Sequence, residues 1–282
     1  MKVLITGSHG QLGRDVVNAF SPTCTVFAFG RDELDIANTE QVNEKISAVK
    51  PDIIIHCAAY TAVDLAETET DKAYQVNAIG TRNVTVAAEN VGAKICYIST
   101  DYVFDGKGTS PYKEYDSTNP QGVYGRSKWA GEQLVQSLST KYFIVRTSWV
   151  FGKHGQNFVK TMLKFGREKG SLKVVNDQIG SPTYTVDLAA FLSELVFTEK
   201  YGIYHASNSD ICSWFDFAKE IFTQARVTVD LNPCKTEEFP RPAPRPAYSV
   251  MDHMAIRTNG FKDLPPWQDA LKRFLREIGE IE

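Results

Sequence analysis

The first thirteen residues predict a buried strand that runs into a tight, glycine-rich turn and then into a helix. Residues 2–6 form a short apolar run, and Gly7, Gly10 and Gly13 follow at intervals of three. Glycines at this spacing permit a sharp turn and close helix packing. They also let the backbone approach a pyrophosphate, which the N-terminal amides of the helix favour. A lone glycine-rich turn is also compatible with an ordinary connection, but its strand–turn–helix setting favours a dinucleotide site.

Short apolar segments alternate with amphipathic segments through the first half of the chain. Five predict strands, over residues 2–6, 24–29, 52–57, 94–99 and 142–147. Four predict helices, over residues 11–20, 39–49, 70–91 and 124–139. Such alternation is typical of parallel βαβ units. We therefore expect an α/β fold with a Rossmann-type doubly wound parallel sheet, in which ligands gather beyond the carboxyl ends of the strands.

The alternation weakens after residue 150. Helices are expected over residues 156–168, 185–197, 214–224 and 266–278, with a short strand over 173–175 and a proline-dense loop over 233–246. Residues 1–150 are then an NAD(P)-binding domain. Residues 151–282 are mainly a smaller substrate-binding lobe, from which some segments return to the first domain.

Composition excludes several classes of function. The 282 residues are 43% hydrophobic and carry a net charge of −3, so a sizeable core is expected and nucleic acid is not an expected partner. No apolar run approaches the ~18 residues of a membrane span, and no signal peptide is evident, so we expect a cytoplasmic protein without a membrane partner. Neither a disulfide framework nor a metal site is indicated by the five scattered cysteines, Cys24, Cys57, Cys96, Cys212 and Cys234.

Tyr124 and Lys128 are four residues apart in a predicted helix, and Ser99 and Thr100 end the strand before it. A spacing of four places both side chains on one helix face. A nearby ammonium would lower the pKa of the phenol from its ordinary ~10 towards neutrality, where general acid–base catalysis is efficient. The spacing occurs often by chance, so the surrounding motifs decide whether it carries chemistry.

These motifs together resemble the extended short-chain dehydrogenase/reductases and, within them, the dTDP-4-dehydrorhamnose reductase family. The matching blocks follow one another along nearly the whole chain: Thr6-Gly7-x-x-Gly10-x-x-Gly13, Cys57-Ala58-Ala59-Tyr60, Ser99-Thr100-Asp101-Tyr102, Val123-Tyr124-Gly125, Arg146-Thr147-Ser148-Trp149, Asn157-Phe158 and Asp177-Gln178-x-Gly180-x-Pro182-Thr183. The resemblance implies reduction of the 4-keto group of dTDP-4-dehydro-L-rhamnose to dTDP-L-rhamnose. Tyr124 would be the general acid, Lys128 would lower its pKa and bind the nicotinamide ribose, and Thr100 would orient the keto oxygen.

The resemblance also implies a set of cofactor contacts. Gly7, Gly10, Gln11 and Leu12 would contact the pyrophosphate, and Asp35 and Ile36 the adenine. Ala58, Ala59 and Tyr60 would line the middle of the cofactor, and Asn77 would contact it from the next helix. Tyr124 and Lys128 would contact it at the nicotinamide end. Structural interpretations stay open for several of them. Ala58 and Ala59 are also what close helix–strand packing requires. Asn77 is also compatible with a solvated helix position, and Asp35 with a turn carboxylate.

The choice between NADPH and NADH rests on the residues after the second strand. Arg31 suits the 2′-phosphate of NADPH, whereas Asp32 is near the position expected for a ligand of the NADH ribose. Both residues are also compatible with a solvent-facing role. We expect NADPH, with NADH as an alternative.

The implied substrate contacts are Thr100, Asp101, Tyr102, Trp149 and Arg245. Trp149 is also compatible with a place in the core, since tryptophan is highly buried on average. It directly follows a strand end, which favours a contact with the substrate. Arg245 lies in an Arg-Pro pair of the proline-dense loop, and a guanidinium grips phosphate bidentately, although solvated loop arginines are common. The expected partners are thus a dTDP-sugar and, as one option, a second copy of the chain in a homodimer.

Three other functions are compatible with parts of this pattern. A 4,6-dehydratase is disfavoured, because a second carboxylate would follow Asp101, where this chain has Tyr102. A nucleotide-sugar 4-epimerase would keep the tyrosine–lysine pair and is excluded less firmly. A non-catalytic, NADP-binding regulatory subunit resembling the β subunit of methionine adenosyltransferase is the rival from another class, since fold and site residues can persist without activity.

Overall fold

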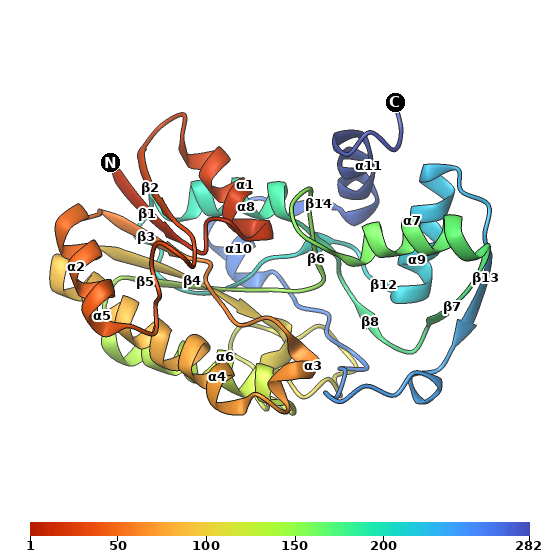
Figure 1. The fold of residues 1–282 in the computed structure, drawn as a ribbon, viewed down its shortest axis with the longest axis horizontal. Helices are drawn as coiled ribbons and strands as arrows, with labels where there is room; N and C mark the ends of the chain where they lie inside the picture. The colour runs from red at the N-terminus through yellow and green to blue at the C-terminus, as the bar shows by residue number, and fades with distance from the viewer.

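A six-stranded parallel sheet forms the centre of the computed structural model, which describes residues 1–282 (Figure 1). Its strands are β1 (Lys2–Thr6), β2 (Thr25–Phe29), β3 (Ile53–His56), β4 (Lys94–Thr100), β5 (Tyr142–Thr147) and β10 (Gly202–His205). They lie in the order β10-β5-β4-β3-β1-β2, so the order reverses between β1 and β3. This point of reversal is where open α/β sheets bind ligands.

Helices cover both faces of the sheet. One face packs against α1 (Gln11–Phe20) and α8 (Thr185–Leu195), and the other against α2 (Thr39–Val49), α5 (Thr81–Val91) and α6 (Val123–Leu138) (Figure 1). The sheet is therefore buried on both sides, which explains why β3 is a continuous apolar run, Ile53-Ile54-Ile55, with no exposed surface. The expected Rossmann-type α/β fold is confirmed.

A separate hydrophobic cluster holds the rest of the chain together. It joins α7 (Phe158–Lys169), α9 (Trp214–Ala225) and α11 (Trp267–Glu277), next to the parallel pair β7 (Ser171–Val175) and β13 (Asp230–Cys234) (Figure 1). By contrast, α8 and β10 follow residue 150 in the chain, but α8 packs on the large sheet and β10 is one of its strands. The boundary at residue 150 stays a prediction.

The remaining elements are short. They are α3 (Val63–Ala66), α4 (Thr70–Tyr74), α10 (Met254–Thr258), the 3-10 helices η2 (Asp101–Val103) and η3 (Thr236–Glu238), β6 (Val150–Phe151), β8 (Ile179–Gly180), β9 (Thr183–Tyr184), β11 (Asn208–Ser209), β12 (Cys212–Ser213) and β14 (Leu264–Pro266). A π-helical segment, η1 (Gln75–Gly80), joins α4 to α5, so the helix expected over residues 70–91 is interrupted. None of the helices has both the length and the apolar character needed to cross a membrane.

Candidate active site

The glycine turn after β1 lies against the residues that follow β3. Gly7 has a φ of +67°, and a Cβ placed on it would be 2.6 Å from the backbone nitrogen of Ala58. Only glycine suits this backbone and this contact. Gly10 is the N-cap of α1, no side chain caps this helix end, and its first turn carries no acidic residue. The first backbone amides of α1 therefore remain free for an anion, as a pyrophosphate site requires.

We expect Gly7→Ala to weaken dinucleotide binding and to lower stability by more than the backbone strain alone. Gly92 is a matched control, because its φ is +74° but no atom lies within 4 Å of a Cβ placed there. Gly92→Ala should cost about 1 kcal/mol for the left-handed backbone. Thermal unfolding and fluorescence titration with a reduced nicotinamide dinucleotide measure the two effects. Equal losses in both variants would contradict the close approach at Ala58.

Asn77 lies behind the site rather than on its surface. Its side chain accepts a hydrogen bond from the Tyr60 amide at 2.8 Å, and it donates to the Tyr60 carbonyl at 3.0 Å and to Ser127 Oγ at 2.9 Å. It is 0% exposed and its amide is fully used by these bonds, so its direct contact with a cofactor stays a prediction. The π-helical segment η1 directs this amide inward, where it holds the loop that carries Ala58 and Ala59 against α6.

The expected adenine-side residues differ in exposure. Arg31 and Asp35 are exposed after β2, and Asp35 Oδ1 accepts a hydrogen bond from the Ala37 amide at 3.0 Å, as a turn carboxylate does. Ile36 is almost fully buried in the core between the sheet and α2. A contact of Ile36 with adenine stays a prediction, since most of its side chain packs inside the protein.

Gln11 connects the glycine turn to the second cluster of helices. Its amide donates to the Val150 carbonyl at 3.2 Å and accepts from Asn157 Nδ2 at 2.9 Å. Asn157 also donates to the Gly152 carbonyl at 2.8 Å and caps α7 through the Lys160 amide. Leu12, beside Gln11, packs partly against the core under the sheet. The sequence indicates Asn157 only as part of a motif. Its hydrogen bond to Gln11 places it beside the glycine turn.

Tyr124 and Thr100 meet at the carboxyl end of β4. Tyr124 lies in the first turn of α6, and the Thr100 side chain is close enough to its phenol to lower the pKa of that phenol against the larger effect of burial. A Cβ on Gly125 would be 2.3 Å from the Tyr102 carbonyl oxygen, so glycine is needed for α6 to approach the strand end this closely. Thr100 Oγ1 also donates to Asp101 Oδ1 at 3.1 Å. The hydroxyl of Thr100 thus lies between the phenol and a carboxylate.

Lys128 is 2% exposed, and its ammonium donates to the Ile98 carbonyl at 2.7 Å. Nζ also lies 4.0 Å from the centre of the Tyr97 ring. Burial lowers the pKa of Lys128 to about 7, although Glu132 acts against this shift. Burial raises the pKa of Tyr124 to about 12, partly offset by the nearby Thr100 side chain. The expected net lowering of the Tyr124 pKa beside Lys128 is therefore wrong, because burial dominates, and the phenol keeps its proton at neutral pH.

Asp101 and Tyr102 complete the strand end. Burial raises the pKa of Asp101 to about 6, although Ser249 and Thr100 lie close enough to lower it, and its Oδ2 is buried without a hydrogen-bond partner. The Tyr102 ring meets the edge of Tyr124 at a centroid distance of 5.5 Å. These side chains surround the Tyr124 phenol with groups that can contact a polar ligand.

Trp149 and Arg245 reach this end of the sheet from other segments. Trp149 has a φ of +49° and stacks on Trp214 of α9 at 3.6 Å between ring centroids, a partner that the sequence did not indicate. Arg245 forms an ion pair with Asp64 at 2.9 Å, and its charge lowers the pKa of Tyr102 against a larger effect of burial. Arg245 is therefore close to the tyrosines, although a carboxylate already holds its guanidinium.

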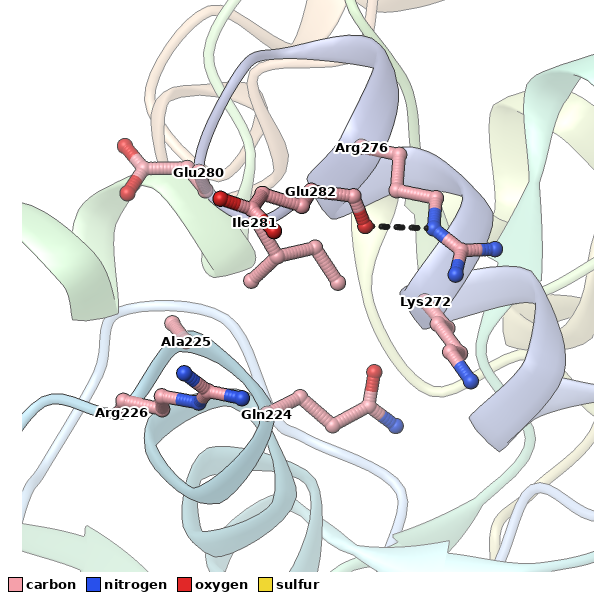
Figure 2. A pocket seen from close by; sticks show the side chains of 8 residues that line it. All are labelled: Gln224, Ala225, Arg226, Lys272, Arg276, Glu280, Ile281 and Glu282. Atoms are coloured by element: carbon pink, nitrogen blue, oxygen red, sulfur yellow. Dashed lines mark hydrogen bonds between the residues drawn. The ribbon is translucent and has the colours of Figure 1, made fainter.

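A cavity of about 700 Å³ lies elsewhere, between the carboxyl ends of α9 and α11 (Figure 2). The eight residues lining it are Gln224, Ala225, Arg226, Lys272, Arg276, Glu280, Ile281 and Glu282. Arg276 Nε donates to the Glu282 backbone oxygen at 2.8 Å on the α11 side of this cavity (Figure 2). None of the expected site residues is among them, so the reaction site is not this cavity.

The parallel sheet with its reversal point, the free helix end at Gly10 and the Thr100–Tyr124–Lys128 trio define a Rossmann-type, nicotinamide-dependent oxidoreductase. Comparison with known proteins narrows this class. The chain belongs to the family described as the RmlD substrate binding domain, which matches residues 1–279.

Named relatives cover almost the entire chain. The dTDP-4-dehydrorhamnose reductase of Aggregatibacter actinomycetemcomitans is 43% identical, over 96% of this chain and 97% of that protein. The spore coat polysaccharide biosynthesis protein SpsK of Bacillus subtilis is 44% identical, over 98% and 97%. The crystal structure of a dTDP-4-dehydrorhamnose reductase from Bacillus anthracis in complex with NADP is 51% identical, with a TM-score of 0.96 over 98% of this chain and 99% of that one.

Proposed function

We propose that this protein is a dTDP-4-dehydrorhamnose reductase that uses NADPH to reduce the 4-keto group of dTDP-4-dehydro-L-rhamnose. The observation that carries the proposal is the approach of the Tyr124 and Thr100 side chains at the carboxyl end of β4, beside the reversal point of the sheet. Two hydroxyl groups that meet there can both contact one carbonyl oxygen. The names of the relatives favour reduction over the epimerase and the regulatory-subunit alternatives.

Tyr124 is the proton donor. The bound reduced nicotinamide supplies the hydride to C4, and the phenol of Tyr124 gives its proton to the C4 oxygen as negative charge develops there. The C=O bond thereby becomes CH–OH. A pKa raised to about 12 keeps this proton on the phenol until the oxygen becomes basic enough to take it. Thr100 orients the oxygen by a hydrogen bond, and the buried setting strengthens this contact.

Lys128 acts after the proton has moved. Its ammonium stabilises the Tyr124 phenolate that remains, because a positive charge at the same helix face favours the ionised phenol. The same ammonium is the proposed hydrogen-bond donor to the nicotinamide ribose. Its bond to the Ile98 carbonyl and the Tyr97 ring below it keep the flexible side chain in one place.

The glycine turn and the start of α1 fit the cofactor's pyrophosphate, because the first amides of α1 are uncapped and its first turn carries no acidic side chain. In this proposal Gly7, Gly10, Gln11 and Leu12 hold the pyrophosphate. Ala58, Ala59 and Tyr60 line the middle of the cofactor, and Asn77 supports their loop from behind. Arg31 is free to meet the 2′-phosphate, which favours NADPH over NADH.

The sugar nucleotide is proposed to bind Asp101, Tyr102, Trp149 and Arg245. The stack of Trp149 on Trp214 supports this by holding a rigid aromatic wall beside the strand ends. Arg245 would exchange part of its bond with Asp64 for the diphosphate of the substrate.

All five cysteines are free thiols, which supports the proposed cytoplasmic location. We also propose that the protein forms a homodimer, and a molar mass from light scattering tests this.

A spectrophotometric assay tests the function. Purified protein, NADPH and dTDP-4-dehydro-L-rhamnose should give loss of the reduced nicotinamide absorbance and equimolar dTDP-L-rhamnose. Tight NADPH binding without turnover would instead support the regulatory subunit. Interconversion of sugar epimers at C4 without net cofactor consumption would support the epimerase.

The pH dependence follows from the two pKa shifts. Lys128 has a pKa lowered to about 7, so its charge is present below this pH and is lost as the pH rises through it. Tyr124 keeps its proton well above that range. We therefore expect kcat/KM for reduction to fall as the pH rises through about 7, with a slope of one proton. A rate that stays flat between pH 6 and pH 9 would contradict a need for the ammonium.

A further inference from the structure

A buried charged cluster adjoins Lys128. Glu132 is one helical turn beyond Lys128 on α6, and its carboxylate accepts hydrogen bonds from Arg146 Nε at 2.9 Å and Arg146 Nη2 at 2.7 Å. Ser99 Oγ donates to the same carboxylate. Glu132 is 0% exposed and Arg146 is 3% exposed, so water screens neither charge. The cluster ties α6 to the two central strands β4 and β5.

The charges in this cluster are unequal. Lys128 and Arg146 are both buried cations, and Glu132 is the carboxylate they share. An isolated buried ammonium is costly and loses its proton unless an opposite charge is near. The hydrogen bonds from Arg146 occupy both carboxylate oxygens of Glu132. The attraction between Lys128 and Glu132 is therefore electrostatic and acts over one turn of the helix.

The other titratable groups around Lys128 carry no compensating charge. They are His56 and Cys57 at the end of β3, Tyr97 on β4 and Tyr124 on α6. Burial lowers the pKa of His56 to about 3, so it is neutral. Burial raises the pKa of Cys57 to about 12, so it remains a thiol. Tyr97 and Tyr124 keep their protons for the same reason.

We propose that Glu132 is a positioning residue that keeps the Lys128 ammonium protonated in the interior and, through Ser99, fixes the strand end that carries Thr100. The inference deepens the proposed function and rests on it for its catalytic meaning. Arg146 has the opposite effect on Lys128, because it draws the same carboxylate to itself and adds a positive charge to the cluster. One carboxylate thereby sets both the charge of Lys128 and the alignment of its neighbours.

The test reads the charge of Lys128 directly. The full-length protein is labelled with ε-¹³C lysine, its NMR spectrum is followed against pH, and the Lys128 signal is assigned by its absence in Lys128→Met. Glu132→Gln should lower the titration midpoint by roughly one unit or more, as expected for loss of a neighbouring opposite charge. Arg146→Met should raise the midpoint. Ser99→Ala keeps all charges and should leave it where it is in the wild type.

An unchanged midpoint in Glu132→Gln, or a fall in Arg146→Met, overturns the proposal. Glu132→Gln could fail to fold because Arg146 loses its partner, in which case the shift of opposite sign in Arg146→Met decides. This measurement needs neither substrate nor cofactor, so it is independent of the proposed reaction. In the reductase assay, the alkaline fall of kcat/KM in Glu132→Gln should move to lower pH by the same amount as the NMR midpoint.

Discussion

Tyr124→Phe should lower kcat for reduction by ~10²–10⁴ while the affinity for NADPH stays within about twofold of the wild type. The phenol supplies the proton that the C4 oxygen takes up, and phenylalanine retains the ring while removing that proton. The packing against Tyr102 is retained, since it involves the ring rather than the hydroxyl. Stopped-flow or steady-state loss of NADPH absorbance gives kcat, and fluorescence titration gives the affinity.

The matched control is Tyr115→Phe, which makes the same chemical change at a tyrosine that is 66% exposed. Its kcat should equal that of the wild type. Turnover near normal in Tyr124→Phe would reject this residue as the proton donor. A loss of NADPH affinity as large as the loss of kcat would indicate that the hydroxyl serves binding rather than proton transfer.

Lys128→Met should impair both steps, with kcat lowered by roughly 10² or more and NADPH binding weakened by roughly 10–100-fold. The ammonium is proposed to contact the ribose and to stabilise the phenolate, so its loss affects the ground state and the reaction. Thermal stability should stay equal or rise, because a methionine replaces a buried cation at similar volume. Lower activity together with equal stability separates this result from misfolding.

Lys94 offers a close control. Its ammonium also donates to backbone carbonyls, those of Val196 and Thr198, and also lies over a tyrosine ring, that of Tyr201. It stands at the opposite end of β4 from Thr100. Lys94→Met should therefore change stability but neither NADPH affinity nor kcat. Unchanged NADPH affinity in Lys128→Met would count against its ribose contact.

The fold could be read largely from local patterns. The five strands expected in the first half of the chain are all present in the sheet, because continuous apolar runs bounded by turns and helices are typical of strands buried on both faces. The sixth strand, β10, was not expected. Its four residues, Gly202 to His205, are too short and too mixed to stand out, and it joins the sheet by pairing with β5 from a distant part of the chain.

The site was predicted as a set of residues but not as an electrostatic arrangement. Sequence spacing places Tyr124 and Lys128 on one face of α6, yet it cannot show that burial dominates both pKa values. The π-helical segment that turns Asn77 inward has no sequence signature of its own. The bond between Gln11 and Asn157 joins residues 146 positions apart, which only the tertiary structure brings together.

A crystal structure of the protein with NADP⁺ and dTDP-L-rhamnose tests the central claim most directly. The account predicts that the hydroxyl groups of Tyr124 and Thr100 both lie within hydrogen-bond distance, ~2.6–3.2 Å, of the C4 oxygen of the sugar. The nicotinamide ring should lie against C4, and no general acid other than Tyr124 should contact the C4 oxygen. A C4 oxygen turned away from Tyr124, or held by another proton donor, would contradict it.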